Sequence, residues 1–259
     1  MASDVLERFM GLRDRDYARQ GLLVCEGRLV LEKALAAGLE LDSALCVPAD
    51  EAGLRDRLAP GTPLEVLPQA ELASLVGFSF HRGVLALAKR PPFKPANSLP
   101  AGHTLVLWNV TDPDNLGTLI RSAAALGARS VCLGGGCADP YGRKALRASM
   151  GVVLGLPVAA LASLDELKGL PGRERRLVVA AALTEQACSP SRVIRRAGRR
   201  PVALVVGNEG WGLPDDVVGA CDLAVRLPMS AGVDSLNVAA AGAILTWELF
   251  SRRGRSATR

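Results

Sequence analysis

The sequence predicts an α/β protein in which a C-terminal three-layer sandwich with a mainly parallel sheet follows a smaller α/β domain. Two observations lead to this prediction. Short, nearly continuous apolar runs alternate with helical patterns, as they do when helices cover both faces of a parallel sheet. A proline-rich segment near residue 95 also interrupts the alternation and divides the chain into two parts.

Residues 1–90 have the pattern of a small α/β domain. Strand-like runs are expected at "LLVCEG" (22–27), "LDSALCV" (41–47), "PLEVL" (63–67) and "GVLALA" (83–88). Helical patterns lie between them at 28–38, 50–58 and 69–76, the first of which ends at Gly38, a common helix stop. Residues 91–102, rich in proline, are expected to be a linker.

Residues 103–259 repeat the alternation more strongly. Six apolar runs are expected to be buried parallel strands: 104–110, 128–135, 156–161, 175–183, 201–208 and 223–228. Helices are expected at 116–126, 141–149, 163–168, 190–197 and 235–250. Ligands of such folds bind in the loops at the carboxyl ends of the strands, so functional residues are sought there.

Composition excludes several classes of protein. Hydrophobic residues make up 49% of the 259 residues and charged residues 22%, an ordinary globular balance. No stretch has the roughly 18 apolar residues of a membrane helix, and the first residues lack a signal-peptide pattern, so a cytoplasmic protein without membrane contact is expected. The six cysteines form no C-x-x-C pair and only two histidines occur, so no metal site is expected and the cysteines are predicted to be free thiols, mostly buried.

The positive charge is concentrated in three arginine clusters. The net charge is +5, and arginines gather in "GRERR" (172–176), "SRVIRRAGRRP" (191–201) and "SRRGRSATR" (251–259). Such runs are often simply solvated, but their clustering favours a polyanionic partner.

The stretch "NVTDPDNLGTLIRSAAALGA" (109–128) combines an acidic loop with an apolar helix. Asp114 or Asn115 is expected to cap the helix, whose buried stripe begins at Leu116. Arg121 lies off this stripe and is expected to reach back over Gly117 toward the loop end of the sheet. It is either a surface arginine beside a turn or part of an anion site.

Two further stretches follow strands at the same expected edge. In "VVGNEGWGLP" (205–214), three glycines surround Glu209, which fits either a plain turn or a close approach of backbone to a ligand. After "RLPMSAG" (226–232), Asp234 or Ser235 is expected to cap a helix that is uncharged from Leu236 to Trp247. That helix is expected to be buried in the core or against a second subunit, and Asn237 within it needs hydrogen-bond partners.

Together these stretches resemble the SpoU (TrmH-like) branch of the SPOUT RNA methyltransferases. Motif 1 of that family, N-x-G-x-x-x-R, matches Asn115, Gly117 and Arg121, and motif 2, G-x-E-G-x-G, matches residues 207–212. Motif 3 matches "LPM" (227–229) and "SLNV" (235–238), and "LRASMG" (146–151) resembles another family segment. Residues 1–90 are similar to the substrate-binding domain that often precedes the catalytic one.

The resemblance implies S-adenosylmethionine-dependent 2′-O-ribose methylation of structured RNA, ribosomal RNA being favoured over transfer RNA. It also implies a trefoil knot, a rare exception among folds, and a homodimer packed through the last helix. The implied cofactor-binding residues are Gly207, Leu227, Leu236, Met229 and Thr184. The implied catalytic residues are Arg121, with Asn115 and Glu209 to orient it, and Ser235 and Asn237 to shape the pocket.

The sequence matches three other functions less well. A nicotinamide-dependent oxidoreductase would need G-x-G-x-x-G after the first strand of the domain, where "NVTDPDNLG" stands instead. A serine hydrolase would need G-x-S-x-G, but "RASMG" (147–151) begins with arginine. A non-catalytic RNA-binding protein on the same scaffold is the remaining alternative, and the three intact motifs weigh against it.

Overall fold

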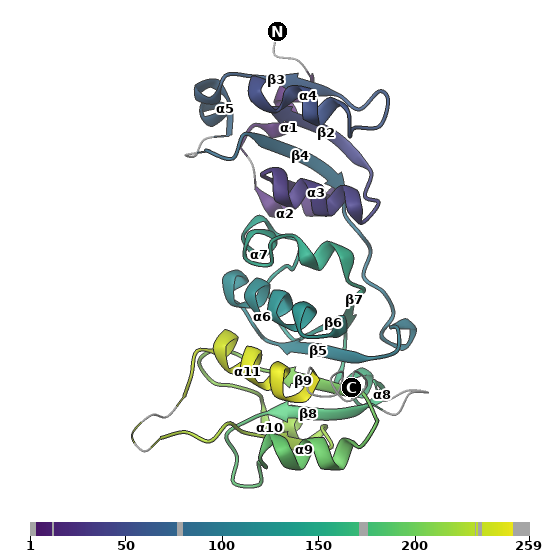
Figure 1. Cartoon of the computed structure of the whole chain (residues 1–259), viewed down its shortest axis with the longest axis vertical. Coiled ribbons are helices and arrows are strands. Elements are labelled where there is room, and N and C mark those ends of the chain that lie inside the picture. Colours follow the sequence, from purple (N-terminus) through teal and green to yellow (C-terminus); the bar gives the residue numbers. More distant parts are fainter. Residues whose placement is uncertain are drawn as a thin grey trace, which may run out of the picture. The chain divides into compact units, whose positions relative to one another are not determined.

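A computed structural model describes residues 4–11, 13–76, 80–170, 176–230, 232 and 235–250. The chain divides into two compact units (Figure 1). Unit 1 consists of Met1–Pro92 and Tyr141–Gly155, and unit 2 of Phe93–Pro140 and Leu156–Arg259. No helix among the described residues is long and apolar enough to cross a bilayer.

Unit 1 is built on a four-stranded sheet in the order β1-β4-β2-β3. Its strands are β1 (Leu22–Glu26), β2 (Leu41–Cys46), β3 (Leu64–Val66) and β4 (Val84–Lys89). β4 is antiparallel to both β1 and β2, whereas β2 and β3 are parallel. The helices are α1 (Asp4–Phe9), α2 (Asp14–Arg19), α3 (Arg28–Ala36), α4 (Glu51–Arg55) and α5 (Gln69–Val76). All four strands and α3, α4 and α5 lie where the apolar pattern predicts them; α1 and α2 were not predicted.

Residues 141–155 belong to unit 1, although the sequence assigned them to the C-terminal domain. This segment contains α7 (Arg143–Ala148) and a short 3-10 helix (Val152–Gly155). Arg143 pairs with Asp14 at 2.7 Å, and Arg147 pairs at 3.0 Å with Glu26, which is buried. Ion pairs between residues more than 100 positions apart leave no local signal, so the sequence could not show that this segment packs with unit 1.

Unit 2 contains a six-stranded sheet in which every neighbouring pair is parallel. The strand order is β10-β8-β9-β5-β6-β7. The strands are β5 (His103–Trp108), β6 (Ala128–Gly134), β7 (Val158–Leu161), β8 (Leu177–Ala181), β9 (Val202–Val206) and β10 (Leu223–Val225). All six coincide with predicted strands, because strands buried on both faces appear in the sequence as continuous apolar runs.

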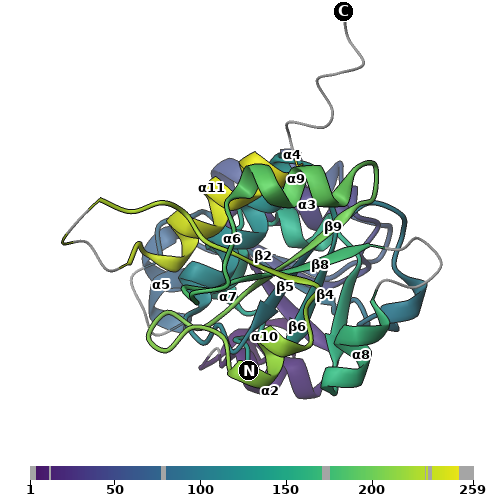
Figure 2. The ribbon, with the colours of Figure 1, turned by 90° about the horizontal axis from the view of Figure 1, so that it is seen from below.

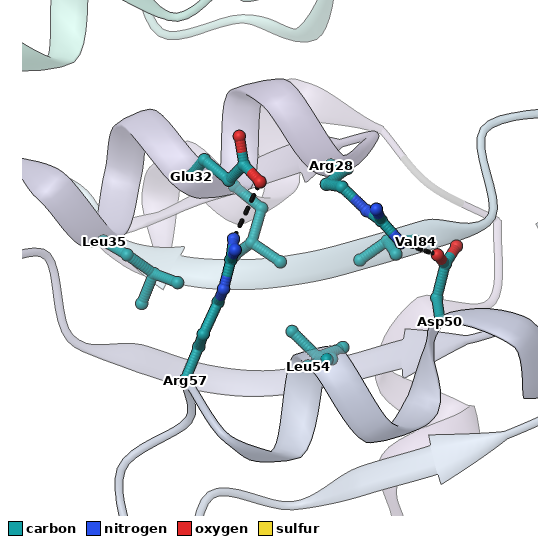
Figure 3. A pocket seen from close by; sticks show the side chains of 9 residues that line it. Arg28, Glu32, Leu35, Asp50, Leu54, Arg57 and Val84 are labelled. Carbon is teal, nitrogen blue, oxygen red and sulfur yellow. Dashed lines mark hydrogen bonds and ion pairs between the residues drawn. The ribbon is translucent and has the colours of Figure 1, made fainter.

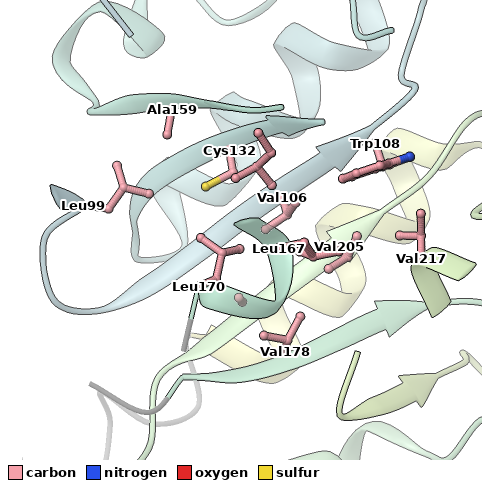
Figure 4. Close-up of a cluster of buried hydrophobic side chains, with 12 residues drawn as sticks. Leu99, Val106, Trp108, Cys132, Ala159, Leu167, Leu170, Val178, Val205 and Val217 are labelled. Atoms are coloured by element: carbon pink, nitrogen blue, oxygen red, sulfur yellow. The ribbon is translucent and has the colours of Figure 1, made fainter. Parts of the chain in front are cut away.

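Helices cover both faces of this sheet and make three layers (Figure 2). One face carries α6 (Pro113–Ala125), α9 (Pro190–Ala197) and α11 (Val238–Phe250), and the other carries α8 (Leu164–Gly169) and α10 (Asp215–Gly219). Figure 4 shows the second face, where Leu167 of α8, Leu170 just after this helix and Val217 of α10 pack on strand residues such as Val106 and Val205. The predicted sandwich is confirmed, and only the short α10 was not predicted.

The predicted starts of α6 and α11 are each wrong by three residues. The α6 helix begins at Pro113, because Asp112 caps it by accepting a hydrogen bond from the Asn115 N–H at 2.8 Å. The α11 helix begins at Val238, and its cap is Asn237, whose Oδ1 accepts from the N–H of Ala239 at 2.9 Å and of Ala240 at 3.2 Å. Ser235 therefore precedes the helix and does not cap it, and Asp234 lies outside the described residues.

The six cysteines are free, and Cys25, Cys46 and Cys132 are buried. Burial raises the pKa of the Cys25 and Cys132 thiols to about 12 and that of Cys46 to about 11. The reactive form is the thiolate, and a thiol of pKa 12 has about 1,000-fold less thiolate at pH 8 than one of pKa 9.

At pH 8 we expect Cys25 and Cys132 to react with Ellman's reagent about 1,000-fold, and Cys46 about 100-fold, more slowly than a free thiol, and all three to react faster as the pH rises toward their pKa values. Stopped-flow absorbance measures the rates, and the urea-unfolded chain, in which all six cysteines should react rapidly, is the control. Rapid reaction of all six thiols in the folded protein would contradict the prediction.

Candidate functional site

A pocket of about 420 Å³ opens at the carboxyl ends of the strands of unit 2. Its walls come from the segments that follow β8, β9 and β10 and from the first turns of α11. Such edges are where α/β folds bind ligands, and this volume is typical of small-molecule sites. The lining includes all five residues that the resemblance implied for a cofactor, together with Ser235 and Glu209: Thr184, Gly207, Glu209, Leu227, Met229, Ser235 and Leu236.

The loop after β9 makes one wall of the pocket from backbone. A Cβ atom added to Gly207 would lie 2.5 Å from both the carbonyl carbon and the oxygen of Gly212, too close for any side chain. Asn208 and Gly212 exchange backbone hydrogen bonds of 3.0 and 3.1 Å, and Gly212 has a φ of +71°, which favours glycine. Gly207 and Gly212 are therefore needed for a tight hairpin that lines the pocket.

Asn208 anchors this hairpin, and sequence reasoning did not select it. Its side chain is buried, and its Nδ2 donates to the Asn109 carbonyl at 2.8 Å. Its Oδ1 accepts from the N–H of Gly210 at 2.8 Å and of Trp211 at 3.4 Å. One signal in the sequence could have identified Asn208. It stands at the end of a buried apolar run, as Asn109 also does.

Three predicted site residues form a hydrogen-bonded chain beside the pocket. The Asn115 amide donates from Nδ2 to Glu209 Oε1 at 3.2 Å, and its Oδ1 accepts from Asn237 Nδ2 at 3.3 Å. These residues come from the start of α6, the loop after β9 and the start of α11. The structure thus brings together parts of all three sequence motifs at one end of the sheet.

Arg121 lies on the third turn of α6 and is exposed. Within the described part of the chain it neither lines the pocket nor forms an ion pair with Glu209, so Glu209 holds Asn115 and not Arg121. Gly117 is buried whereas Thr118 is exposed, so Arg121 shares its surface with Thr118. Its guanidinium is open to solvent on the helix that carries Asn115.

A second hollow, in unit 1, is less suited to a ligand (Figure 3). It has a volume of only about 70 Å³ and lies between α3 and α4. Two ion pairs cross it, Arg57 with Glu32 at 2.7 Å and Arg28 with Asp50, so its charges are already balanced. Among the described residues, no three His, Cys, Asp or Glu side chains are grouped where a metal ion could bind.

Comparison with known proteins identifies relatives over nearly the whole chain. The SpoU rRNA Methylase family model matches residues 102–247. An uncharacterized tRNA/rRNA methyltransferase of Mycobacterium bovis is 38% identical over 235 residues, covering 88% of this chain and 81% of that protein. The 23S rRNA (guanosine(2553)-2′-O)-methyltransferase RlmP of Bacillus subtilis is 31% identical over 238 residues, 91% of each chain.

Solved structures have the same fold. The rRNA methyltransferase of Sinorhizobium meliloti, solved with bound S-adenosylmethionine, is 25% identical with a TM-score of 0.84, covering 98% of this chain and 96% of that one. An RNA 2′-O ribose methyltransferase structure is 30% identical with a TM-score of 0.76, covering 97% of each. From the family match, the identities and the shared fold, the chain belongs to the SpoU rRNA methylase family of RNA methyltransferases.

Proposed function

We propose that this protein transfers a methyl group from S-adenosylmethionine to a ribose 2′-hydroxyl of a structured RNA, ribosomal RNA being favoured over transfer RNA. The observation that carries the proposal is the glycine-shaped pocket next to the Asn115, Glu209 and Asn237 chain. The 2′-O position is supported by the name of the Bacillus subtilis relative, and the preference for ribosomal RNA by that name and by the additional N-terminal unit.

The pocket fits S-adenosylmethionine in shape and chemistry. Its wall at Gly207 is bare backbone, because the space that a Cβ atom would need is filled by the backbone of Gly212. Leu227, Met229 and Leu236 offer apolar contacts, and Thr184 offers a hydroxyl. When bound, S-adenosylmethionine supplies a methyl group on a positively charged sulfur. The ribose 2′-oxygen can attack this methyl group, and the sulfur is then the leaving group.

Arg121 is proposed to bind a phosphate beside the target ribose. Its guanidinium stays protonated in proteins, so it can hold and stabilise charge but cannot act as the base. The proton of the 2′-hydroxyl would pass to that phosphate or to a water molecule while Arg121 stabilises the developing negative charge. Asn115 and Asn237, held by Glu209 and by the cap of α11, would keep the pocket mouth in a fixed geometry.

Arginines on α9 support RNA as the partner. Arg192, Arg195, Arg196 and Arg199 are exposed on and just after this helix, and no acidic residue lies between 186 and 208. They would bind phosphates without reading the base sequence. Arg176, by contrast, is buried and donates to the Gly102 and Leu170 carbonyls at 3.0 and 3.4 Å, so it is not a phosphate contact. Residues 172–175 and 251–259 lie outside the described residues.

The main test is a calorimetric titration of the purified protein with S-adenosylmethionine, followed by mapping of 2′-O-methylated nucleotides in total RNA with and without the gene. We expect one cofactor site per chain and the loss of a ribose methylation from one RNA. A protein that binds RNA but takes up no S-adenosylmethionine would be the non-catalytic alternative. The same map separates ribosomal from transfer RNA, and either RNA would place the enzyme in the cytoplasm.

We also propose a homodimer through α11. α11 carries no charge from Val238 to Trp247, yet it is not buried all round in the single chain: Ala240, Ile244 and Trp247 are exposed along one face, the last two by 43% and 40%. That spacing gives an apolar stripe suited to a second copy of the same helix. Of the two burial alternatives, this exposed face supports packing against a second subunit.

We expect Ile244→Lys to halve the mass measured by light scattering, because an unpaired charge would be buried in the interface. Ala162→Lys, an exposed substitution next to α8 on the other face of the sheet, should leave the mass unchanged. A wild-type protein that is monomeric at all concentrations would contradict the dimer.

The trefoil knot is a further proposal. β10 lies at one edge of the sheet, whereas α11 packs against Leu119 of α6 and Val206 of β9 through Gly242. β10 and α11 are consecutive elements, so the segment that joins them connects an edge strand to a helix over the middle of the sheet, which supports the proposal. An experimental structure in which this segment passes outside every preceding loop would contradict the knot.

A further inference from the structure

Trp211 is the most exposed of the large hydrophobic side chains in the described part of the chain. Its exposed fraction is 82%, against 9% for Trp108 and 40% for Trp247. It lies in the loop that lines the pocket, two positions after Glu209. Neither the proposed cofactor contacts nor the proposed methyl transfer uses this indole.

The hairpin holds the Trp211 backbone in place. The two backbone hydrogen bonds between Asn208 and Gly212 close the loop, and Asn208 Oδ1 accepts from the Trp211 N–H itself. The neighbours of Trp211 are Gly210 and Gly212, so no adjacent side chain covers either face of the indole. A large flat apolar side chain is therefore presented to solvent from a constrained turn at the pocket.

We propose that Trp211 stacks on a nucleobase of the RNA substrate, either that of the methylated nucleotide or that of its neighbour. This inference rests on the proposed function, which brings a ribose to the pocket. Two residues span at most about 7 Å, so Trp211 lies within the reach of one nucleotide from Glu209 and from the Asn115 amide bound to it. Proteins commonly hold unstacked bases of RNA on aromatic side chains.

Stacking also complements the arginine contacts. Arg192, Arg195 and Arg196 recognise charge, which every nucleotide of a strand offers equally, so they cannot fix which ribose enters the pocket. A base held on Trp211 would fix the distance from that base to the reacting ribose. Trp211 is thus proposed as a positioning residue for the substrate.

The test compares Trp211→Ala and Trp211→Phe with the unsubstituted full-length protein. The probes are a mixed-sequence single-stranded RNA of 20 nucleotides and polyphosphate, which carries charge but no bases. We expect the alanine variant to bind the RNA about tenfold more weakly, within the range for loss of one stacking contact, and the phenylalanine variant to bind nearly normally. Affinity for polyphosphate and for S-adenosylmethionine should be unchanged in both.

Tryptophan fluorescence gives a readout that a structural role would not produce. RNA should quench the emission of the unsubstituted protein and polyphosphate should not. Trp211→Phe should lose this quenching, whereas the control Trp247→Phe should retain it.

Other outcomes overturn the inference. Normal RNA affinity in Trp211→Ala would exclude stacking, weakened S-adenosylmethionine binding would place the indole over the cofactor, and a changed mass in light scattering would place it against a second copy. Failure of the unsubstituted protein to take up S-adenosylmethionine would refute the proposed function instead, which keeps the two failures distinct.

Discussion

Replacing Gly207 with alanine is expected to abolish measurable binding of S-adenosylmethionine and to lower the free energy of unfolding by about 1–3 kcal/mol. The added methyl would lie 2.5 Å from the carbonyl carbon and oxygen of Gly212 and 2.7 Å from the nitrogen of Leu213. All three atoms belong to backbone, which cannot rotate away as a side chain can. The hairpin would have to open, and one wall of the pocket would move with it.

Gly210→Ala is the matched control in the same loop. The nearest atom to its added Cβ is Asn208 Oδ1 at 3.4 Å, an ordinary contact, and Gly210 has no positive φ. Calorimetry and thermal unfolding should therefore find Gly210→Ala close to the unsubstituted protein. Equal behaviour of the two alanine variants would mean that the pocket wall at Gly207 is not where the cofactor binds.

Replacing Arg121 with alanine is expected to lower the rate of methyl transfer by about 100- to 1,000-fold, the effect typical of removing one preorganised donor to a transition state. Arg121 lies outside the pocket, so affinity for S-adenosylmethionine should not change. Arg121→Lys should recover little of the rate, because an ammonium keeps the charge but lacks the paired N–H groups that grip a phosphate. Single-turnover transfer of a labelled methyl group measures the rate.

Arg129→Lys is the control for this series. Arg129 is also exposed, but it lies at the amino end of β6, whereas the pocket lies at the carboxyl ends of the strands. The Arg129→Lys variant should therefore transfer methyl groups at the normal rate. Full activity in Arg121→Lys would remove the paired-contact mechanism, and full activity in Arg121→Ala would remove Arg121 from the reaction.

The sheet of unit 2 could be predicted because burial on both faces leaves a signal in the sequence itself. β9, for example, has no polar residue from Val202 to Val206. The helix caps were harder, since Asp112, Asp114 and Asn115 are all acceptable caps and only Pro113, whose fixed φ suits the first helical position, favours Asp112.

The candidate site was only partly accessible from the sequence. The three motifs identified Asn115, Glu209 and Asn237, but their mutual contacts depend on where the strands end in space. Asn208 was missed because its role is to hold backbone that lies next to it only after the hairpin has formed. Arg121 illustrates the converse: its motif is clear, yet among the described residues it forms no hydrogen bond or ion pair with another site residue.

The assignment of residues 141–155 to unit 1 limits how this protein can be dissected. The polypeptide passes between the units three times, after Pro92, Pro140 and Gly155. A fragment starting at residue 93 would carry α7 without Asp14 and Glu26, leaving Arg143 and Arg147 stripped of their carboxylates and Ala145 and Leu146 uncovered. Truncation at residue 93 would thus separate α7 from the unit in which its ion pairs are formed. A chimera that exchanges unit 1 between relatives therefore has to exchange residues 141–155 together with residues 1–92.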